Sequence, residues 1–374
     1  MNFEFSEEQL MLRDQARGYL AQHCPPQTVR NVLDGPQEYD SDLWQGIVEM
    51  GWTATTIPEA YGGLGLGYYE LAIIAEELGR AVAPVPFSSS VYLATEAILA
   101  FGNEAQKTHW LPKLAAGECI ATFAHSEGPG RTQPNHLRTQ VGEAHLTGMK
   151  APIPDGLCAD IAIVSARGDH DDSVRLCLVD LAAEGVEKSA VRTLDFSRGH
   201  ATLTFDKAPT EPLGEGVHPR HAFERLYDRA AVLMAWEQLG LADMALEQAC
   251  DYAKQRYAFG RAIGTFQAIK HKLAGMYVKN TLARSNGYHG AWALASDSET
   301  LPLAAATARV AAIQASLHAT QENIQTHGGM GFTWEFDCQF YYRRAKLLSL
   351  ALGSERHWQD RLVSALATGD DVAA

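Results

Sequence analysis

The sequence has few cysteines, no long apolar run and little positive charge. Its six cysteines are scattered and no pair has CxxC spacing, so neither a zinc site nor a disulfide framework is predicted, and no metal is expected. No stretch is long and apolar enough to predict a membrane-spanning helix. The first ten residues lack a basic region followed by an apolar one, so no secretory signal is expected and a cytoplasmic location is predicted.

The charge balance is strongly acidic. With 45 Asp and Glu against 31 Lys and Arg, the formal net charge is −14, which argues against the basic face that nucleic-acid binding requires. A local basic cleft for an anionic ligand stays compatible with this value, because net charge says little about one cleft. A hydrophobic fraction of 46% over 374 residues is typical of a globular protein with two or three packed sub-regions.

The hydrophobic pattern changes type twice along the chain, and no internal repeat is present. Residues 1–117 have helical periodicity, with capping-box spacing at Ser6 and a helix expected to stop at Gly79. Residues 118–213 hold short apolar or alternating segments separated by Gly, Pro and Asp, which predict a β domain. Helical periodicity returns in residues 214–374. This order predicts an α+β fold with an N-terminal helical domain, a middle β-barrel or sandwich, and a C-terminal four-helix bundle.

Three sequence blocks carry a family resemblance. The first is PEAYGGLGLG at residues 58–67, followed by EELGR at 76–80. The second is RYAFGRAIGTFQ at 256–267. The third is QTHGGMGF at 325–332, which leads to RRAK at 343–346. In this order and spacing the blocks resemble those of the acyl-CoA dehydrogenases, over essentially the whole chain.

The resemblance implies a flavoenzyme that binds FAD and an acyl-CoA thioester, with an electron-transfer flavoprotein as the usual electron acceptor. In such enzymes a carboxylate removes the α-proton while the β-hydrogen leaves as a hydride to the flavin. A carboxylate can remove so weakly acidic a proton only where preorganised donors stabilise the enolate. The flavin supplies the hydride acceptor, which no side chain can do.

The second and third blocks correspond to family positions that hold the adenosine diphosphate half of an FAD bound mainly by the neighbouring subunit. Arginine makes charge-assisted hydrogen bonds to a diphosphate, amide side chains donate hydrogen bonds, and glycines let backbone amides approach phosphate oxygens. The alternative is that the phenylalanine belongs to the core and the arginine is a solvated cation. The residues carried over for these contacts are Arg256, Phe259, Gln267, Gln325, Gly328 and Gly329.

The residue that usually removes the proton is missing. The family base stands just before a Gly-Thr pair, and here Leu352 precedes Gly353 and Ser354. Leucine cannot accept a proton. Ser354 keeps a hydroxyl where threonine is usual, and it is carried over as a cofactor contact.

A subgroup of the family places its base at the start of the long helix before the second block. The corresponding position is about Ala230, which has no carboxylate either. Asp228 and Glu237 lie nearby and are weak candidates for a displaced base. Each is more readily interpreted as a solvated or structural carboxylate, because most acidic residues face water.

The flavin-contacting strands also depart from the family pattern. Where the family has LTEPxAGSD, residues 125–132 read HSEGPGRT, in which Ser126 keeps a hydroxyl predicted to lie near the flavin. Where the family has a tryptophan against the flavin and a threonine bonded to it, this chain has Pro152 and Pro154. Two prolines in a strand predict local distortion or an edge position.

The groups that would serve a neighbour's FAD are therefore present, whereas those that would hold this chain's own flavin and do the chemistry are replaced. The sequence is similar to the non-catalytic subunit of heterotetrameric acyl-CoA dehydrogenases from bacterial steroid side-chain degradation. That likeness implies a paralogous, catalytically complete partner subunit with which FAD is shared. Two alternatives stay open: a homo-oligomeric dehydrogenase with a displaced base, and a non-enzymatic acyl-CoA-binding protein.

Overall fold

The computed structural model describes residues 5–128, 130, 132, 136–168, 174–217 and 220–370. Pro129 and Arg131, within the stretch predicted to approach the flavin, lie outside the described residues. Packing divides the chain into two compact units. The helical unit comprises Met1–Val29, Tyr68–Ala83 and Ala231–Ala374, and the sheet unit comprises Arg30–Gly67 and Pro84–Ala230. The three-domain boundaries stay a prediction, because this grouping assigns the first helices to both units.

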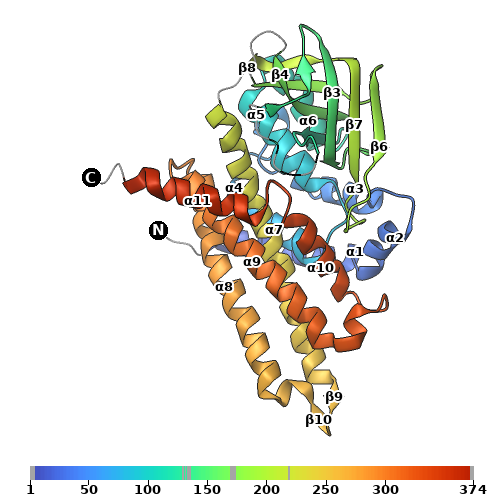
Figure 1. The fold of residues 1–374 in the computed structure, drawn as a ribbon, viewed down its shortest axis with the longest axis vertical. Coiled ribbons are helices and arrows are strands. Elements are labelled where there is room, and N and C mark those ends of the chain that lie inside the picture. Colours follow the sequence, from blue (N-terminus) through green and yellow to red (C-terminus); the bar gives the residue numbers. More distant parts are fainter. Residues whose placement is uncertain are drawn as a thin grey trace. The chain divides into compact units, whose positions relative to one another are not determined.

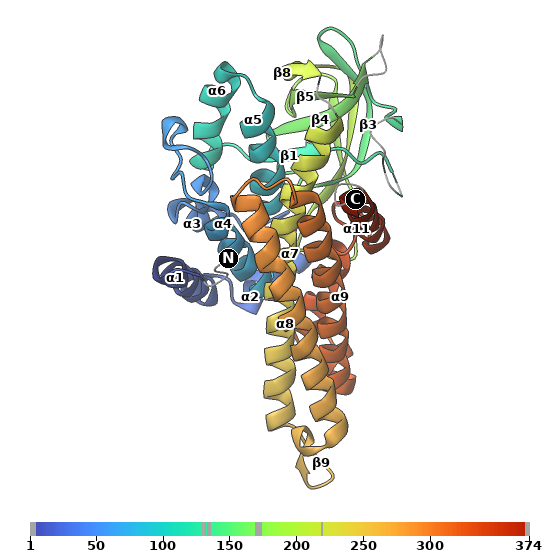
Figure 2. The ribbon, with the colours of Figure 1, turned by 90° about the vertical axis from the view of Figure 1, so that its left-hand side faces the viewer.

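The helical unit consists of long α-helices and one short hairpin (Figures 1 and 2). The capping box at its first helix is confirmed, since the Ser6 side chain accepts a hydrogen bond from the backbone N–H of Gln9. The helix α7 runs through both units. The elements are α1 (Glu7–His23), α4 (Tyr68–Arg80), α7 (Arg220–Gln255), β9 (Tyr257–Ala258), β10 (Arg261–Ala262), η5 (Ile263–Thr265), α8 (Gln267–Ala295), α9 (Leu301–His327), η6 (Gly328–Phe332), α10 (Cys338–Leu348) and α11 (Glu355–Asp370).

The helices α4 and α7 approach each other closely at two glycines. A Cβ atom on Gly79 would lie 1.9 Å from the carbonyl oxygen of Glu237, and one on Gly240 would lie 1.8 Å from that of Glu76. Because a side chain at either position would push the two backbones apart, glycine is required here by packing. Gly79 was expected to stop its helix. The helix α4 does end one residue later, at Arg80, but the glycine serves the crossing.

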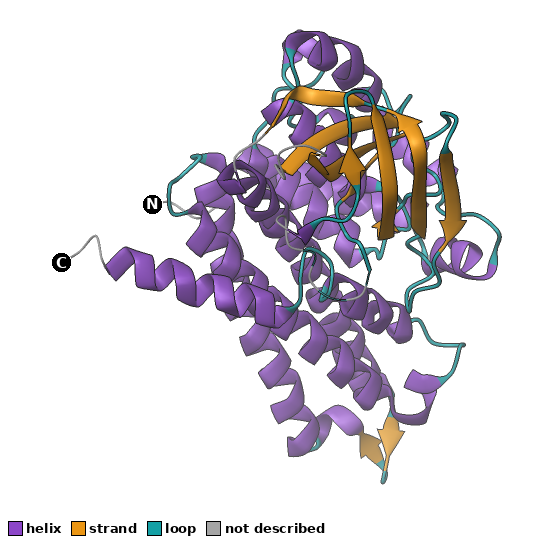
Figure 3. Ribbon diagram, turned by 45° about the horizontal axis from the view of Figure 1, so that its top comes forward, coloured by secondary structure: helices purple, strands orange, loops and turns teal. Residues whose placement is uncertain are grey.

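The sheet unit is built on one curled sheet, shown in orange in Figure 3. Its strand order is β6-β7-β3-β2-β4-β5-β8, and β1 pairs in parallel with β4. The strands are β1 (Ala121–Ala124), β2 (Gln140–Val141), β3 (His145–Pro154), β4 (Ile161–Gly168), β5 (Val174–Asp180), β6 (Val186–Ala190), β7 (His200–Pro209) and β8 (Glu211–Val217). The remaining elements are α2 (Pro26–Asp34, of which residues 30–34 belong to this unit), α3 (Ser41–Glu49), η1 (Trp52–Ala54), η2 (Glu59–Tyr61), η3 (Ser88–Thr95), α5 (Glu96–Phe101) and α6 (Glu104–Ala115).

Two kinds of element escape prediction from the pattern. The π-helix η3 is buried along its whole length, so its sequence shows no polar face from which a period can be read. The strand β6 reads VEKSA and is exposed over most of its length, so it lacks the alternation of a half-buried strand. Its pairing with β7 alone makes it a strand.

The distortion predicted from the two prolines of β3 is confirmed. The pairing of β3 with β7 shifts register between Lys150 and Ile153, and Pro152 lies within that shift. The alternative of an edge strand is wrong, because β3 lies between β7 and β2 in the sheet. Since proline offers no N–H to a ladder, the strand bulges here instead of pairing regularly.

Candidate functional site

The position of the expected base lies in the turn between α10 and α11. Leu352 is half-buried with φ of +61°, and Gly353 follows with φ of +111°. A left-handed backbone is uncommon for leucine and costs on the order of 1 kcal/mol, so the surroundings must hold this turn. Ser354 is exposed, and its hydroxyl accepts a 3.4 Å hydrogen bond from the backbone N–H of His357 at the start of α11.

A fully buried arginine holds this turn from the side of α9. The Nη2 atom of Arg309 donates hydrogen bonds to the carbonyl oxygens of Leu348 and of Ala351, the latter at 2.8 Å. Its Nη1 atom donates to the side-chain oxygen of Gln238 on α7. Burial lowers the pKa of Arg309 to about 9, and the charge of Glu237 opposes that shift.

Glu237, one candidate for a displaced base, lies inside the helical unit with 3% of its surface exposed. Its Oε1 atom is 3.6 Å from Nη1 of Arg344, which is fully buried on α10. Arg344 in turn donates to the carbonyl oxygens of Val82 and Ala83 after α4. A carboxylate between buried guanidinium groups compensates their charge, which favours the structural interpretation of Glu237.

The other candidate, Asp228, lies on the part of α7 that belongs to the sheet unit, and it is buried there together with Ala230. One turn earlier, the rings of Phe223 and Tyr227 stack at 5.0 Å between centroids. Both rings also pack against His125, at 4.9 and 5.7 Å. Aromatic rings therefore fill the space between β1 and α7, beside the position of the subgroup's base.

An ion pair fixes the loop that follows β1. The Nζ atom of Lys150, fully buried on β3, lies 2.7 Å from Oε1 of Glu127. The same carboxylate accepts hydrogen bonds from the backbone N–H groups of Arg138 (2.7 Å) and Thr139 (3.0 Å). Burial opposes the charge of Glu127, but Lys150 and these hydrogen bonds outweigh it and lower the pKa of Glu127 to about 2. Burial lowers the pKa of Lys150 to about 8, although Glu127 opposes that shift.

Ser126 stands beside this ion pair and is half-buried. Its hydroxyl donates a 3.4 Å hydrogen bond to the carbonyl oxygen of Gly128, and its own carbonyl accepts one of 2.9 Å from Ala151. Further along β3, Pro152 is exposed and Pro154 is half-buried. At these two positions the strand offers pyrrolidine rings, without the aromatic face and the hydroxyl that the family pattern has there.

Three residues carried over for trans contacts lie at one end of the helical unit, around the β9–β10 hairpin (Figure 1). Arg256 and Gln267 are exposed. Phe259 is 95% exposed at the tip of the hairpin, with φ of +53°. Its place excludes the alternative that Phe259 belongs to the core of this chain. So exposed a ring indicates a surface that another molecule covers.

The other three residues lie at the C-terminal end of α9. Gln325, Gly328 and Gly329 are exposed, and Gly328 has φ of +61°. A Cβ atom on Gly328 or Gly329 would meet no atom of the described chain within 4 Å, so both glycines face open space. The ring of His327 stacks on that of Tyr252 at 4.2 Å, one turn before Arg256. The structure therefore brings the second and third blocks to the same end of the helical unit.

Basic residues collect around this end, although the chain as a whole is acidic. Residues 249–280 contain one acidic residue, Asp251. The six basic residues of this segment are Lys254, Arg256, Arg261, Lys270, Lys272 and Lys279. Such a local concentration of positive charge suits an anionic group such as a diphosphate.

The two halves of an FAD site fit this chain unequally. An exposed arginine, two glycines that face open space and a surplus of basic residues fit a diphosphate presented from outside the chain. In the sheet unit, the prolines of β3 and the ring cluster of Phe223, Tyr227 and His125 do not fit an isoalloxazine held by this chain.

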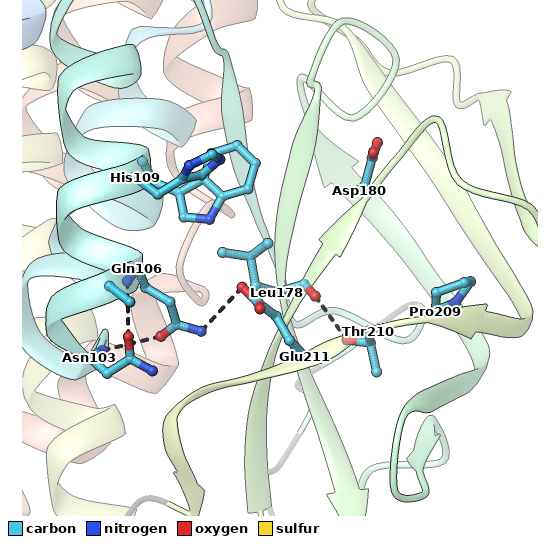
Figure 4. Close-up of a pocket in the computed structure, with 10 residues that line it drawn as sticks. Asn103, Gln106, His109, Leu178, Asp180, Pro209, Thr210 and Glu211 are labelled. Carbon is cyan, nitrogen blue, oxygen red and sulfur yellow. Dashed lines mark hydrogen bonds between the residues drawn. The ribbon is translucent and has the colours of Figure 1, made fainter.

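Two cavities lie apart from all of these residues. One of about 620 Å³ lies in the sheet unit between α6 and the strands β5 and β8 (Figure 4). In its wall Gln106 donates to Glu211 at 3.2 Å, and Thr210 donates to the carbonyl oxygen of Leu178 at 2.9 Å. The other, of about 400 Å³ in the helical unit, lies beside the ion pair of Arg17 and Glu77. Neither is lined by a residue assigned to the flavin or to the base.

Comparison with known proteins decides the family. Residues 6–118 match the model of the acyl-CoA dehydrogenase N-terminal domain, and residues 214–364 match that of the C-terminal domain. Acyl-CoA dehydrogenase IpdE2 of Mycobacterium tuberculosis is 32% identical over 361 residues, which cover 96% of this chain and 97% of that protein. The chain belongs to the acyl-CoA dehydrogenase family. The resemblance stated from the three sequence blocks is thereby confirmed, and FAD is the cofactor of this family.

Solved structures of this family share the fold. A steroid ACAD, Tcur3481-Tcur3483, has a TM-score of 0.88 and 31% identity, covering 98% of this chain and 99% of its own. The ChsE4-ChsE5 complex from Mycobacterium tuberculosis has a TM-score of 0.90 and 26% identity, with coverage of 98% and 99%. Butyryl-CoA dehydrogenase from Megasphaera elsdenii has a TM-score of 0.91 and 25% identity, with coverage of 98% and 100%. The predicted acyl-CoA dehydrogenase fold, with helical regions before and after a curled sheet, is confirmed.

In the part of the chain that the structure describes, no helix has the length and apolar character needed to cross a membrane.

Sequence reasoning missed the arginine that holds the turn of the lost base. The available signal is that Arg309 is the first charged residue of α9, whose first half is otherwise apolar or small. A lone arginine in such a helix indicates a specific buried partner. The partners here are mainly backbone carbonyls, which no sequence pattern marks.

Proposed function

We propose that this chain is the subunit without a catalytic base in a heterotetrameric acyl-CoA dehydrogenase. It pairs with a paralogous, catalytically complete subunit and completes that subunit's FAD site in trans. The reaction is the α,β-desaturation of an acyl-CoA thioester, and a steroid side-chain thioester is the proposed substrate class. Likeness to a steroid ACAD at 31% identity and to the ChsE4-ChsE5 complex supports this choice.

One observation carries the proposal. The end of the helical unit presents Arg256, Gly328 and Gly329 to the outside, whereas the turn of the base carries Leu352. Loss of function by random change would not spare one half of a cofactor site while removing the other. A chain that lends its intact half to a neighbour accounts for both facts.

Each residue has a definite task in this proposal. Arg256 binds the diphosphate of the partner's FAD through charge-assisted hydrogen bonds, and the backbone amides of Gly328 and Gly329 approach the same oxygens. Gln267 and Gln325 donate amide hydrogens and orient the cofactor. FAD, when bound, supplies the hydride acceptor of the reaction. An electron-transfer flavoprotein as acceptor and a cytoplasmic location stay predictions.

The test is flavin stoichiometry. The chain is purified alone and together with its paralogous subunit, and the absorbance of the flavin band is measured per protomer. The expected result is no flavin on the chain alone and one FAD per pair of unlike subunits. One FAD per protomer on the chain alone would overturn the proposal and restore the homo-oligomeric alternative with a displaced base. A colourless chain that binds acyl-CoA and stimulates no paralogue would establish the non-enzymatic alternative.

A second variant tests the chain's own site. Leu352→Glu restores a carboxylate at the family position. No acyl-CoA oxidation is expected from the variant alone, because Pro152 and Pro154 still replace the flavin contacts. Turnover with an artificial electron acceptor would contradict the claim that this chain holds no flavin of its own.

A further inference from the structure

The helix α8 is apolar on two opposite faces. One face is buried within the helical unit through Met276, Ala283 and Gly287. The opposite face is exposed to solvent, and three of its large apolar residues are more than half exposed: Tyr277 (62%), Val278 (53%) and Leu282 (61%). A helix that is apolar all round is normally buried on all sides. The exposed face therefore requires a cover from outside this chain.

The exposed face forms a continuous strip along the helix, because its members recur every three or four residues. We call it the α8 strip. Its members, all exposed, are Ala274, Tyr277, Val278, Thr281, Leu282 and Ser285.

The two hydroxyl groups of the strip do not need an outside partner. Thr281 donates to the carbonyl oxygen of Tyr277 at 2.9 Å, and Ser285 donates to that of Thr281 at 3.2 Å. Both bonds turn the polar atoms back onto the helix's own backbone. The strip consequently presents methyl groups and an aromatic ring, which bury well against another apolar surface.

The strip carries no charge over three helical turns, in a chain whose residues are 20% charged. Around a twofold axis each residue lies near its own copy, so a charged residue on such an axis would repel itself. Contacts between unlike subunits are instead commonly specified by opposite charges. An uncharged strip therefore fits a second copy of this chain better than it fits a paralogue.

The ends of the strip indicate how the two copies are oriented. Lys270 precedes the strip on the same face, and His289 follows it. Parallel helices would bring Lys270 against its own copy, which costs free energy. Antiparallel helices bring it against the neutral far end, with the axis near Val278 and Thr281.

We infer that the α8 strip is a self-contact, in which two copies of this chain pack their α8 helices antiparallel about a twofold axis. This inference deepens the proposed function, on which it rests for the existence of a second kind of subunit. The strip spans only about 17 Å at 1.5 Å per residue. A contact of that length is small beside the roughly 1,200–2,000 Å² of a stable interface. It therefore joins two heterodimers that are already held together where FAD is shared.

Cysteine crosslinking tests the self-contact directly. Val278→Cys and Thr281→Cys are made separately, and Lys279→Cys is the matched control because its side chain leaves the helix away from the strip. The six native cysteines are buried or half-buried. Under mild oxidation of the chain together with its paralogous subunit, at least one strip variant should link this chain to itself, and the control should not. No self-link from either strip variant, or an equal link from the control, overturns the inference.

A second variant separates this interface from the FAD interface. Leu282→Glu places like charges across the proposed axis, and native mass spectrometry should show the complex at half its mass with one FAD retained per pair of unlike subunits. An unchanged mass, or loss of FAD together with the partner, overturns the self-contact. If the unaltered complex holds no FAD, the proposed function fails instead, while the crosslinking result still decides the self-contact.

Discussion

The Nη2 atom of Arg309 donates a 2.8 Å hydrogen bond to the carbonyl oxygen of Ala351, the residue before Leu352. A buried cation on α9 thus holds the turn in which the family's base would stand. The turn keeps its left-handed geometry at Leu352 although the carboxylate is gone. Preservation of this shape without its chemistry shows that the turn serves the packing of the helical unit.

Replacement of Arg309 by methionine should destabilise the chain by about 3 kcal/mol. The variant leaves Gln238 and the carbonyl oxygens of Leu348 and Ala351 buried without their donor, and each such group costs about 1–3 kcal/mol. Urea unfolding followed by circular dichroism measures the change. Arg309→Lys should recover part of the loss, because an ammonium group can still donate. A loss below about 0.5 kcal/mol from Arg309→Met would mean that the turn holds itself.

Glu237→Gln should lower stability without changing the chemical step of the assembled enzyme. Removal of one partner from a buried ion pair leaves an uncompensated charge on Arg344 and typically costs about 3–5 kcal/mol. Thermal unfolding and single-turnover flavin reduction in the complex measure the two effects. A flavin reduction rate that falls by two orders of magnitude or more, with the fold intact, would instead identify Glu237 as the base.

Glu127→Gln should destabilise the sheet unit in a pH-dependent manner. The pKa of Glu127 is lowered from 4.5 to about 2 in the folded chain, because Lys150 and two backbone N–H groups outweigh its burial. Its stabilisation is therefore fully present above pH 4.5 and is lost as the pH falls from 4.5 towards 2. Unfolding free energies of the chain and the variant should differ by on the order of 3 kcal/mol at pH 7 and converge below pH 3.

The control for this experiment is Glu143→Gln, a change at an exposed carboxylate of the same unit. It should leave the unfolding free energy unchanged within about 0.5 kcal/mol at every pH. A constant difference between Glu127→Gln and the unaltered chain from pH 7 to pH 2 would contradict the ionised pair with Lys150.

Arg256→Ala in this chain should weaken retention of FAD by the assembled enzyme. One charged hydrogen bond is worth about 1.5–3 kcal/mol, which corresponds to a roughly 10- to 150-fold higher dissociation constant for FAD. Fluorescence of released flavin during dilution measures it. Lys254→Ala, which removes an exposed cation paired with Asp251 one turn earlier, is the matched control and should change little. Full retention of FAD in Arg256→Ala would remove this residue from the cofactor site.

The sequence by itself determined the family and the loss at position 352, because both rest on the identity and order of residues. Leucine cannot accept a proton in any conformation, and three ordered blocks identify the family without coordinates. The predicted strands β1, β4, β5 and β7 and the long helices followed from periodicity, since burial imposes it directly on the sequence. The fully buried η3 and the exposed β6 escaped, because neither has one wet and one dry face.

Only the tertiary structure decided what the remaining polar residues do. The sequence left Glu237 open as a base or a structural carboxylate, and its 3.6 Å distance to Arg344 favours the second interpretation. The role of Arg309 depends on carbonyl oxygens 39 and 42 residues away, which share no pattern with it. The exposure of Phe259 and of the α8 strip is likewise absent from the sequence. Periodicity records which face of a helix is apolar, but only the packed chain shows which apolar face its own core leaves uncovered.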